Sequence, residues 1–141
     1  MKQVYATFIA ENNGDFLVYV PDMDIYTEGD SFVDAIEMAR DAIGLKGIDL
    51  EDDQKEFPVP SSQDEAIKKA KSNADIFDYS SGILTFVDVD FSEYRRKNDM
   101  KTVRRNVALP NWLNYEADKA GINVSRVLQD ALMKTLNVSR N

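Results

Sequence analysis

The sequence predicts an α+β fold in which a small, mostly antiparallel sheet has helices on one face. Apolar runs alternate with turn residues over the first 30 residues, and a stretch at helical spacing follows them. A separate strand, helix and helix pattern occupies the last forty or so residues. We therefore expect an N-terminal domain over residues 1–90, a linker over residues 91–100 and a C-terminal domain over residues 101–141.

The expected sheet takes three strands from the start of the chain and one from residues 83–89. Residues 4–10 and 16–20 are apolar runs, and the loop between them contains an Asn-Gly pair that readily adopts positive φ. Residues 25–27 form a short third strand. The last strand follows a Ser-Ser-Gly turn.

Two helices are expected between the third and the last strand. Residues 32–43 carry apolar side chains at helical spacing, behind an Asp-Ser pair that can cap the helix. Gly44 stands where a C-terminal glycine is expected. Residues 46–60 are polar, acidic and proline-containing, which is typical of a loop, and residues 62–70 indicate a second, shorter helix.

The net charge of −8 is divided unevenly along the chain. Residues 1–90 contain 20 Asp and Glu against 7 Lys and Arg, whereas residues 91–141 contain 5 against 10. A basic part suits nucleic acid, and an acidic part repels nucleic acid and suits a basic protein. An acidic surface that only keeps the chain soluble is an equally good interpretation of the first part.

Histidine and cysteine are both absent, which excludes disulfides, thiolate zinc sites and histidine-dependent catalysis. We expect a protein that is not an enzyme, with no catalytic residues, no metal and no cofactor. Five aspartates are the only candidates for a two-metal nuclease centre: Asp15, Asp22, Asp24, Asp88 and Asp90. Their places in a turn, after a proline and at a strand end instead favour a solvated face or a partner contact.

No apolar run approaches the length of a membrane-spanning helix, and the N-terminus lacks a secretory apolar region. Together with the absence of cysteine, these features favour a cytoplasmic location.

The C-terminal pattern begins with a strand over residues 102–110 that ends at a proline. One helix follows it and ends near Gly121, and Asn123 is placed to cap a second helix. Such a unit is too small to bury its apolar faces alone. We therefore expect a homodimer in which two strands pair and the helices interlock.

Residues 101–137 resemble the ribbon-helix-helix repressors, through the strand before Pro110, the Trp-Leu pair after it and the Ala-Gly-Ile-Asn-Val-Ser run at 120–125. The resemblance implies a dimerisation module whose two-stranded ribbon enters the major groove of DNA. It assigns base reading to alternate strand residues, and Arg suits guanine while Asn suits adenine. The base-reading residues would be Thr102, Arg104 and Asn106. The phosphate-binding residues would be Lys101, Asn123, Val124 and Ser125.

Arg105 departs from the ribbon-helix-helix pattern, because the family usually has an apolar residue on the core side of the ribbon there. Whether Arg105 faces the edge of the core or the DNA stays open at this point.

Residues 3–45 look like the HicB antitoxin pattern, in which a strand ends in Val20-Pro21-Asp22 and a helix starts at Gly29-Asp30-Ser31. The similarity continues loosely to about residue 90. HicB proteins often carry a C-terminal DNA-binding domain of the helix-turn-helix or ribbon-helix-helix kind. The resemblance implies a partial ribonuclease-H-like fold without ribonuclease activity.

The same resemblance implies the antitoxin of a type II toxin-antitoxin system. Such a protein neutralises a HicA-type mRNA-cleaving ribonuclease toxin by direct binding and represses its own operon through operator DNA. The assembly would be a homodimer through the C-terminal domain, or a tetramer. An alternative is a ribbon-helix-helix transcriptional repressor whose acidic N-terminal domain binds another protein or a small ligand. The toxin-contacting residues and the operator sequence are not assigned by the sequence.

Overall fold

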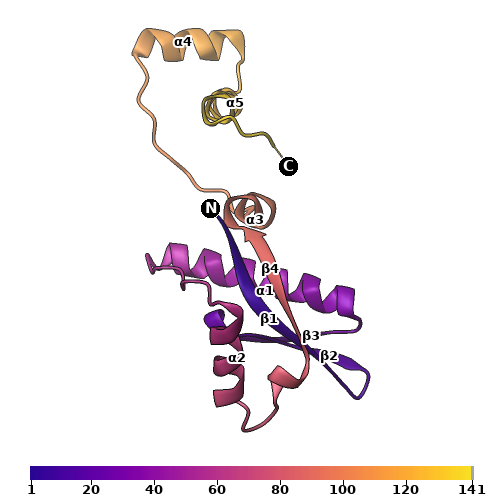
Figure 1. Cartoon of the computed structure of the whole chain (residues 1–141). Coiled ribbons are helices and arrows are strands. Elements are labelled where there is room, and N and C mark those ends of the chain that lie inside the picture. Colours follow the sequence, from indigo (N-terminus) through magenta and orange to yellow (C-terminus); the bar gives the residue numbers. More distant parts are fainter. Residues whose placement is uncertain (141) are drawn as a thin grey trace. The chain divides into compact units, whose positions relative to one another are not determined.

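The computed structural model describes residues 1–140 and divides the chain into two compact units, residues 1–99 and residues 100–141. The first unit contains a sheet with helices, and the second contains two helices that follow a segment without regular structure (Figure 1). None of the helices within residues 1–140 combines the length and the apolar character that crossing a membrane requires.

The sheet of the first unit has four antiparallel strands in the order β3-β2-β1-β4. The strands are β1 (Lys2–Asn12), β2 (Asp15–Val20), β3 (Ile25–Gly29) and β4 (Ile83–Asp90). Asn13 and Gly14 join β1 to β2, and their φ angles of 55° and 87° are those that a two-residue hairpin needs. The four expected strands and the antiparallel α+β class are therefore confirmed. Short 3-10 turns precede β3 (η1, Pro21–Met23) and β4 (η2, Tyr79–Ser81).

Helices cover both faces of the sheet, so the expectation that they share one face is wrong. The two helices are α1 (Phe32–Asp52) and α2 (Gln63–Ser72). Ile9 of β1 packs in one cluster with Ala39 and Ile43 of α1. Phe8, which points to the other face, packs in a second cluster with Ala66 of α2. The physical reason is visible in β1, where six consecutive residues are buried, because a strand covered on both faces is apolar on both.

Helix α1 continues eight residues beyond Gly44, where the sequence predicted its end, so residues 46–52 are helical and not a loop. The glycine serves packing instead of capping. A methyl group at Gly44 would overlap the ring of Tyr94, and one at Gly47 would overlap the ring of Phe91. These two glycines let a later helix approach α1 closely.

That later helix is α3 (Phe91–Asn98), and it replaces the linker predicted over residues 91–100. Asp90 caps it by accepting a hydrogen bond from the Glu93 amide at 3.1 Å. Phe91 is buried in the main core, and Arg95 forms ion pairs of 3.0 Å with Glu51 and Asp52 of α1. The sequence did not predict this helix, because only two of its residues, Phe91 and Tyr94, supply apolar packing.

The second unit contains α4 (Asn111–Ala120) and α5 (Val124–Leu136). Gly121 ends α4 in the left-handed conformation, with φ of 66°, as the sequence predicted. The predicted strand over residues 102–110 is not formed, and this segment has neither helix nor strand. A strand exists only when hydrogen-bonded to a neighbour, and none of the four sheet strands pairs with it. A ribbon-helix-helix module is therefore not evident as a separate unit of the single chain.

Candidate functional site

The Asp22 carboxylate lies in η1, directly after β2, and holds distant parts of the first unit together. Its side chain is 1% exposed and accepts hydrogen bonds from the Ser61 hydroxyl at 2.5 Å and from the Ser61 amide at 2.7 Å. Lys69 of α2 donates to it at 2.7 Å. Burial alone would raise the pKa of Asp22, but the hydrogen bonds from Lys69 and Ser61 outweigh burial and lower the pKa. A carboxylate engaged in this way fixes α2 against the sheet.

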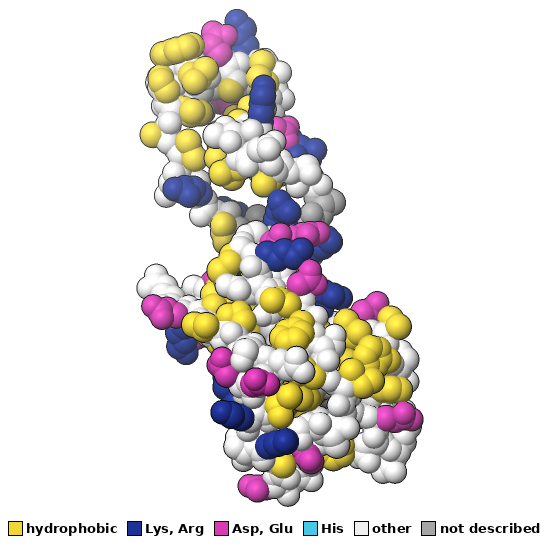
Figure 2. Space-filling model, viewed as in Figure 1, with side chains coloured by type: hydrophobic (Ala, Val, Ile, Leu, Met, Phe, Trp, Pro, Cys, Tyr) yellow, Lys and Arg dark blue, Asp and Glu magenta, His cyan; other side chains and the backbone are white. Residues whose placement is uncertain are grey.

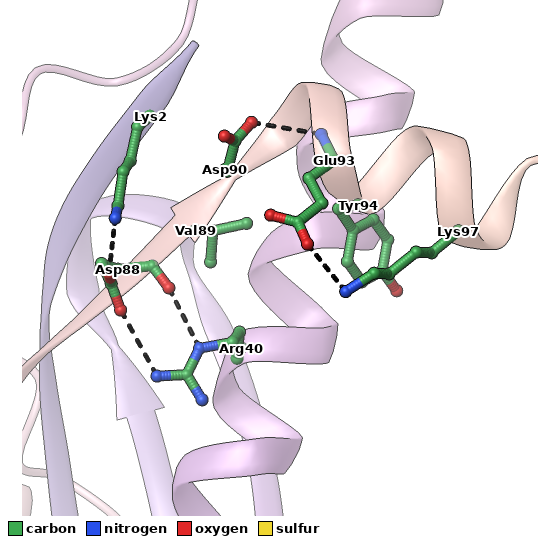
Figure 3. Close-up of a pocket in the computed structure, with 8 residues that line it drawn as sticks. All are labelled: Lys2, Arg40, Asp88, Val89, Asp90, Glu93, Tyr94 and Lys97. Carbon is green, nitrogen blue, oxygen red and sulfur yellow. Dashed lines mark hydrogen bonds and ion pairs between the residues drawn. The ribbon is translucent and has the colours of Figure 1, made fainter. Parts of the chain in front are cut away.

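Asp88 and Asp90 lie at the end of β4 beside the start of α3 (Figure 3). Asp88 forms ion pairs with Lys2 at 3.2 Å and with Arg40 of α1 at 3.4 Å. The hydrogen bond and the charge of Lys2 lower the pKa of Asp88, and the hydrogen bond from the Glu93 backbone amide lowers that of Asp90. The cavity between these residues has a volume of about 240 Å³. Its walls carry charges of both signs.

The five aspartates do not converge on a metal centre. Asp15 begins β2 and Asp24 occupies a left-handed turn after η1, both exposed, while the other three are engaged as described. Within residues 1–140 no group of three or more acidic, histidine or cysteine side chains is placed to hold a metal ion. Of the five, Asp22 and Asp88 therefore act in ion pairing and Asp90 in helix capping.

The predicted base-reading residues Thr102, Arg104 and Asn106 are all exposed, as are Lys101 and Arg105 beside them. They lie in the segment without regular structure that connects α3 to α4 (Figure 1). The fold of the single chain thus leaves these side chains at the surface without arranging them on a common strand face.

The start of α5 brings the other predicted residues together. The Asn123 side chain accepts a hydrogen bond from the Arg126 amide at 3.1 Å, and Val124 and Ser125 form the first turn. Backbone amides of a first turn lack partners within the helix and, with the helix dipole, favour an anion. Arg126, which the sequence analysis did not single out, adds a positive charge to the same turn.

The second unit presents apolar side chains at its surface. Within residues 100–140 no residue is buried. Yellow apolar groups accordingly gather on this unit in the space-filling view (Figure 2). The large exposed ones are Met100, Val103, Val107, Leu109, Trp112, Leu113, Tyr115, Ile122, Val127, Leu132 and Leu136. Exposed apolar surface of this extent is typical of an interaction site.

A family model described as a HicB-like antitoxin of bacterial toxin-antitoxin systems matches residues 5–130. The chain belongs to this family. The match spans the sheet, all of α3 and α4, and the first half of α5, so it includes both units. The resemblance that the sequence analysis drew from the Val-Pro-Asp and Gly-Asp-Ser motifs is therefore confirmed.

Two solved structures share the fold of this HicB-like chain. One is a chain of a toxin-antitoxin complex from Streptococcus pneumoniae, with 22% identity, a TM-score of 0.60 and coverage of 96% of this chain and 99% of that one. The other is the antitoxin HicB of Burkholderia pseudomallei, with 23% identity, a TM-score of 0.51 and coverage of 96% and 97%. A search of curated proteins found no match to this chain.

HicB-like antitoxins are not enzymes, which agrees with the expectation drawn from the missing histidine and cysteine.

One group of residues was not predicted from the sequence. The rings of Tyr19, Tyr26 and Tyr79 lie together beside the α2-covered core cluster, although these residues come from three separate segments. Only the strand register and the place of η2 bring them together, so no local pattern in the sequence reveals them.

Proposed function

We propose that this HicB-like antitoxin neutralises a HicA-type mRNA-cleaving toxin by binding it directly through residues 1–99. We further propose that it represses its own operon through residues 100–141, which dimerise as a ribbon-helix-helix module and bind operator DNA. Membership in the antitoxin family supports the binding of a toxin. The exposed apolar side chains of the second unit support the dimerisation that a DNA-binding ribbon requires.

Charge supports the assignment of the toxin to the first unit. Residues 1–99 contain 22 Asp and Glu against 10 Lys and Arg, and residues 100–141 contain 3 against 7. A protein that binds RNA phosphates carries basic groups, and an acidic surface attracts such a protein and raises its association rate. Toxin binding to the first unit should therefore weaken as salt concentration rises.

Co-expression tests the antitoxin activity. The small protein encoded beside this chain should arrest growth when it is made alone, and growth should recover when the full chain is made with it. The two proteins should also co-purify. A neighbouring protein that is harmless, or that arrests growth whether or not this chain is present, contradicts the antitoxin role. It would favour a repressor whose acidic unit takes another ligand.

The dimer follows from the energetics of the second unit. Burying apolar surface contributes about 25 cal/mol per Å², and residues 100–140 bury no side chain fully within the chain. Pairing two copies of residues 102–109 would create the two-stranded ribbon and cover the apolar side of that ribbon with α4 and α5. The proposed dimer thus gives the segment the strand partner that a single chain cannot supply.

In this dimer Thr102, Arg104 and Asn106 share the outer face of the ribbon, because alternate residues of a strand point the same way. Arginine and asparagine pair with guanine and adenine edges in the major groove. The first turn of α5, with Asn123, Val124 and Ser125, would hold a backbone phosphate, and Lys101 would contact another.

Fluorescence anisotropy with DNA from upstream of the gene tests this assignment. Full-length protein should prefer that DNA over a scrambled duplex. The combined change Arg104→Ala and Asn106→Ala should abolish the preference, since each base contact contributes about 1 to 3 kcal/mol. Arg105→Ala is the matched control, because it removes a neighbouring arginine from the other face and should keep the preference. Equal preference in the double variant would contradict the proposed ribbon register.

A further inference from the structure

The cluster of Tyr19, Tyr26 and Tyr79 lies at β3, an edge strand of the sheet, and has no role in the activities proposed above. The rings of Tyr19 and Tyr26 stack with centroids 4.8 Å apart, and the Tyr79 ring lies 5.1 Å from the first and 6.0 Å from the second. Phe77 meets Tyr79 edge-on at 4.9 Å. Part of this cluster supports α2, but it extends past the core to the surface.

The surface part of the cluster encloses a pocket of about 260 Å³. This is several times the roughly 30 Å³ that one water molecule takes up in the liquid, so a long side chain has room to enter. The lining residues are Tyr26, Asn73, Asp75, Ile76, Phe77 and Tyr79. Tyr26 is 52% exposed and Ile76 is fully exposed, so the opening is accessible to a macromolecular partner.

Hydrogen bonds hold the aromatic walls in place. The Asn73 side-chain amide donates to the hydroxyl oxygens of Tyr26 and Tyr19, the latter at 3.4 Å. Burial raises the pKa of both Tyr19 and Tyr79. The pocket is therefore formed by the chain itself, and hydrogen bonds hold its rings in place before any partner arrives.

The chemistry of the lining favours a cation. Asp75 contributes a carboxylate, and none of the six lining residues is Lys or Arg. The surrounding unit has 12 more acidic than basic residues. The face of an aromatic ring attracts a cation within about 6 Å of its centre, and an arginine guanidinium can also stack flat on the ring.

We propose that this pocket receives an arginine side chain of the basic partner protein. The guanidinium would stack on the Tyr26 ring, beside the Tyr79 ring that is tilted by 58° from it, and pair with the Asp75 carboxylate. The aliphatic part of the side chain would contact Ile76. The inference rests on the proposed antitoxin function, because it assigns one contact of that toxin to a place on the first unit.

The direct probe is a blocked arginine, N-acetyl-arginine methylamide, added to the full-length protein and followed by NMR at the Ile76 methyl groups and the Asn73 side-chain amide. The matched ligand is the citrulline analogue, which has nearly the same shape but no charge. Arginine should bind at least about tenfold more tightly than citrulline. Equal binding of the two, or shifts that avoid the pocket, would overturn the proposal.

Three variants test whether the Tyr26 ring and the Asp75 charge bind the arginine. Tyr26→Leu removes a ring and should weaken arginine binding by about tenfold. Tyr26→Phe loses the hydrogen bond from Asn73 but keeps the ring stacked on Tyr19, so it should weaken binding by about twofold or less. Asp75→Asn changes only an exposed charge, so it leaves the fold intact and should weaken binding by about threefold. Unchanged binding in both Tyr26→Leu and Asp75→Asn would remove the pocket as the binding site.

The same variants with the toxin separate this proposal from the one on which it rests. Toxin should dissociate about tenfold faster from the Tyr26→Leu protein than from the Tyr26→Phe protein. Equally slow dissociation from both refutes the pocket and leaves the antitoxin function standing. If the wild-type chain neutralises no toxin, the proposed antitoxin function is wrong. The pocket then has no toxin arginine to receive, so its proposed role is overturned even if the free arginine derivative binds.

Discussion

The two units of the chain differ in where they place their apolar side chains. Every buried hydrophobic residue among residues 1–140 lies in the first unit, where α1 and α2 cover opposite faces of one sheet. In the second unit Gly121 ends α4 and the Asn123 side chain caps the start of α5, yet none of its described residues is buried. Helix caps and turns therefore specify local structure in both units, whereas only the first contains the second layer that a core needs.

Whether a unit can form its own core depends on its topology and not on local signals such as helix caps. Asn123 caps the start of α5, just as Ser31 caps the start of α1, and Gly121 marks the end of α4. The first unit adds a returning strand, β4, and a closing helix, α3, which complete its core. We expect the second unit to obtain the equivalent completion from another copy of the chain.

The largest expected effect concerns the closing helix. Phe91→Ala removes a side chain that is 1% exposed and packs against Phe57 with ring centroids 4.7 Å apart. The free energy of unfolding of the first unit should fall by about 3 to 5 kcal/mol, measured by urea denaturation. Phe86→Ala, at a residue 48% exposed, is the control and should cost about 1 kcal/mol or less. A loss for Phe91→Ala as small as the one expected for Phe86→Ala would mean that α3 is not part of the core.

The next effect concerns the second unit. Leu132→Glu places a charge on an exposed apolar position of α5 and should raise the dimer dissociation constant at least about a hundredfold, because the charge would be buried between copies. Sedimentation over a concentration series measures this. Gln129→Glu adds the same charge at a polar position of the same helix and should leave the dimer intact. A dimer unaffected by the first change would exclude α5 from the interface.

A smaller effect tests the close approach of α1 and α3. Replacing glycine by alanine inside a helix ordinarily stabilises by about 1 kcal/mol. Gly47→Ala should instead destabilise the first unit by about 1 to 3 kcal/mol, because the new methyl group meets the Phe91 ring. Lys46→Ala, one residue earlier and exposed, should be close to neutral. Thermal denaturation that shows a stabilised Gly47→Ala protein would contradict the packing.

The smallest effect depends on pH. The lowered pKa of Asp22 means that its carboxylate stabilises the fold above the ordinary aspartate pKa of about 3.9, and this contribution is lost as pH falls through the lower folded pKa. Asp22→Asn should therefore cost about 1 to 2 kcal/mol near pH 7. The difference from wild type should shrink below about pH 4. A difference that is constant with pH would show that Asp22 does not titrate as described.

Much of the first unit could be predicted from the sequence because its signals are local. The Asn-Gly turn fixed the hairpin, alternating and apolar runs located the four strands, and Ser31 and Ser62 marked the helix starts. The Val-Pro-Asp and Gly-Asp-Ser motifs led to the family. Each of these features depends on residues within a few positions of one another.

The features that sequence reasoning missed depend on long-range contacts. Helix α3 is mostly polar and was taken for a linker, since the importance of Phe91 appears only when Gly47 faces it. The opposite placement of α2 depends on strand order. The aromatic pocket joins Tyr26 to Asn73 and Tyr79, which are far apart in the chain. The base-reading role of Arg104 and Asn106 stays a prediction.

The most direct test of the account is hydrogen exchange on the full chain, measured alone, with the co-purified small basic protein, and with upstream DNA. Two separate footprints are expected. The basic protein should slow exchange within residues 1–99, including residues 73–79, and DNA should slow exchange within residues 102–109 and at the first turn of α5. Protection of the sheet by DNA, or of residues 102–109 by the basic protein alone, would contradict the assignment of one partner to each unit.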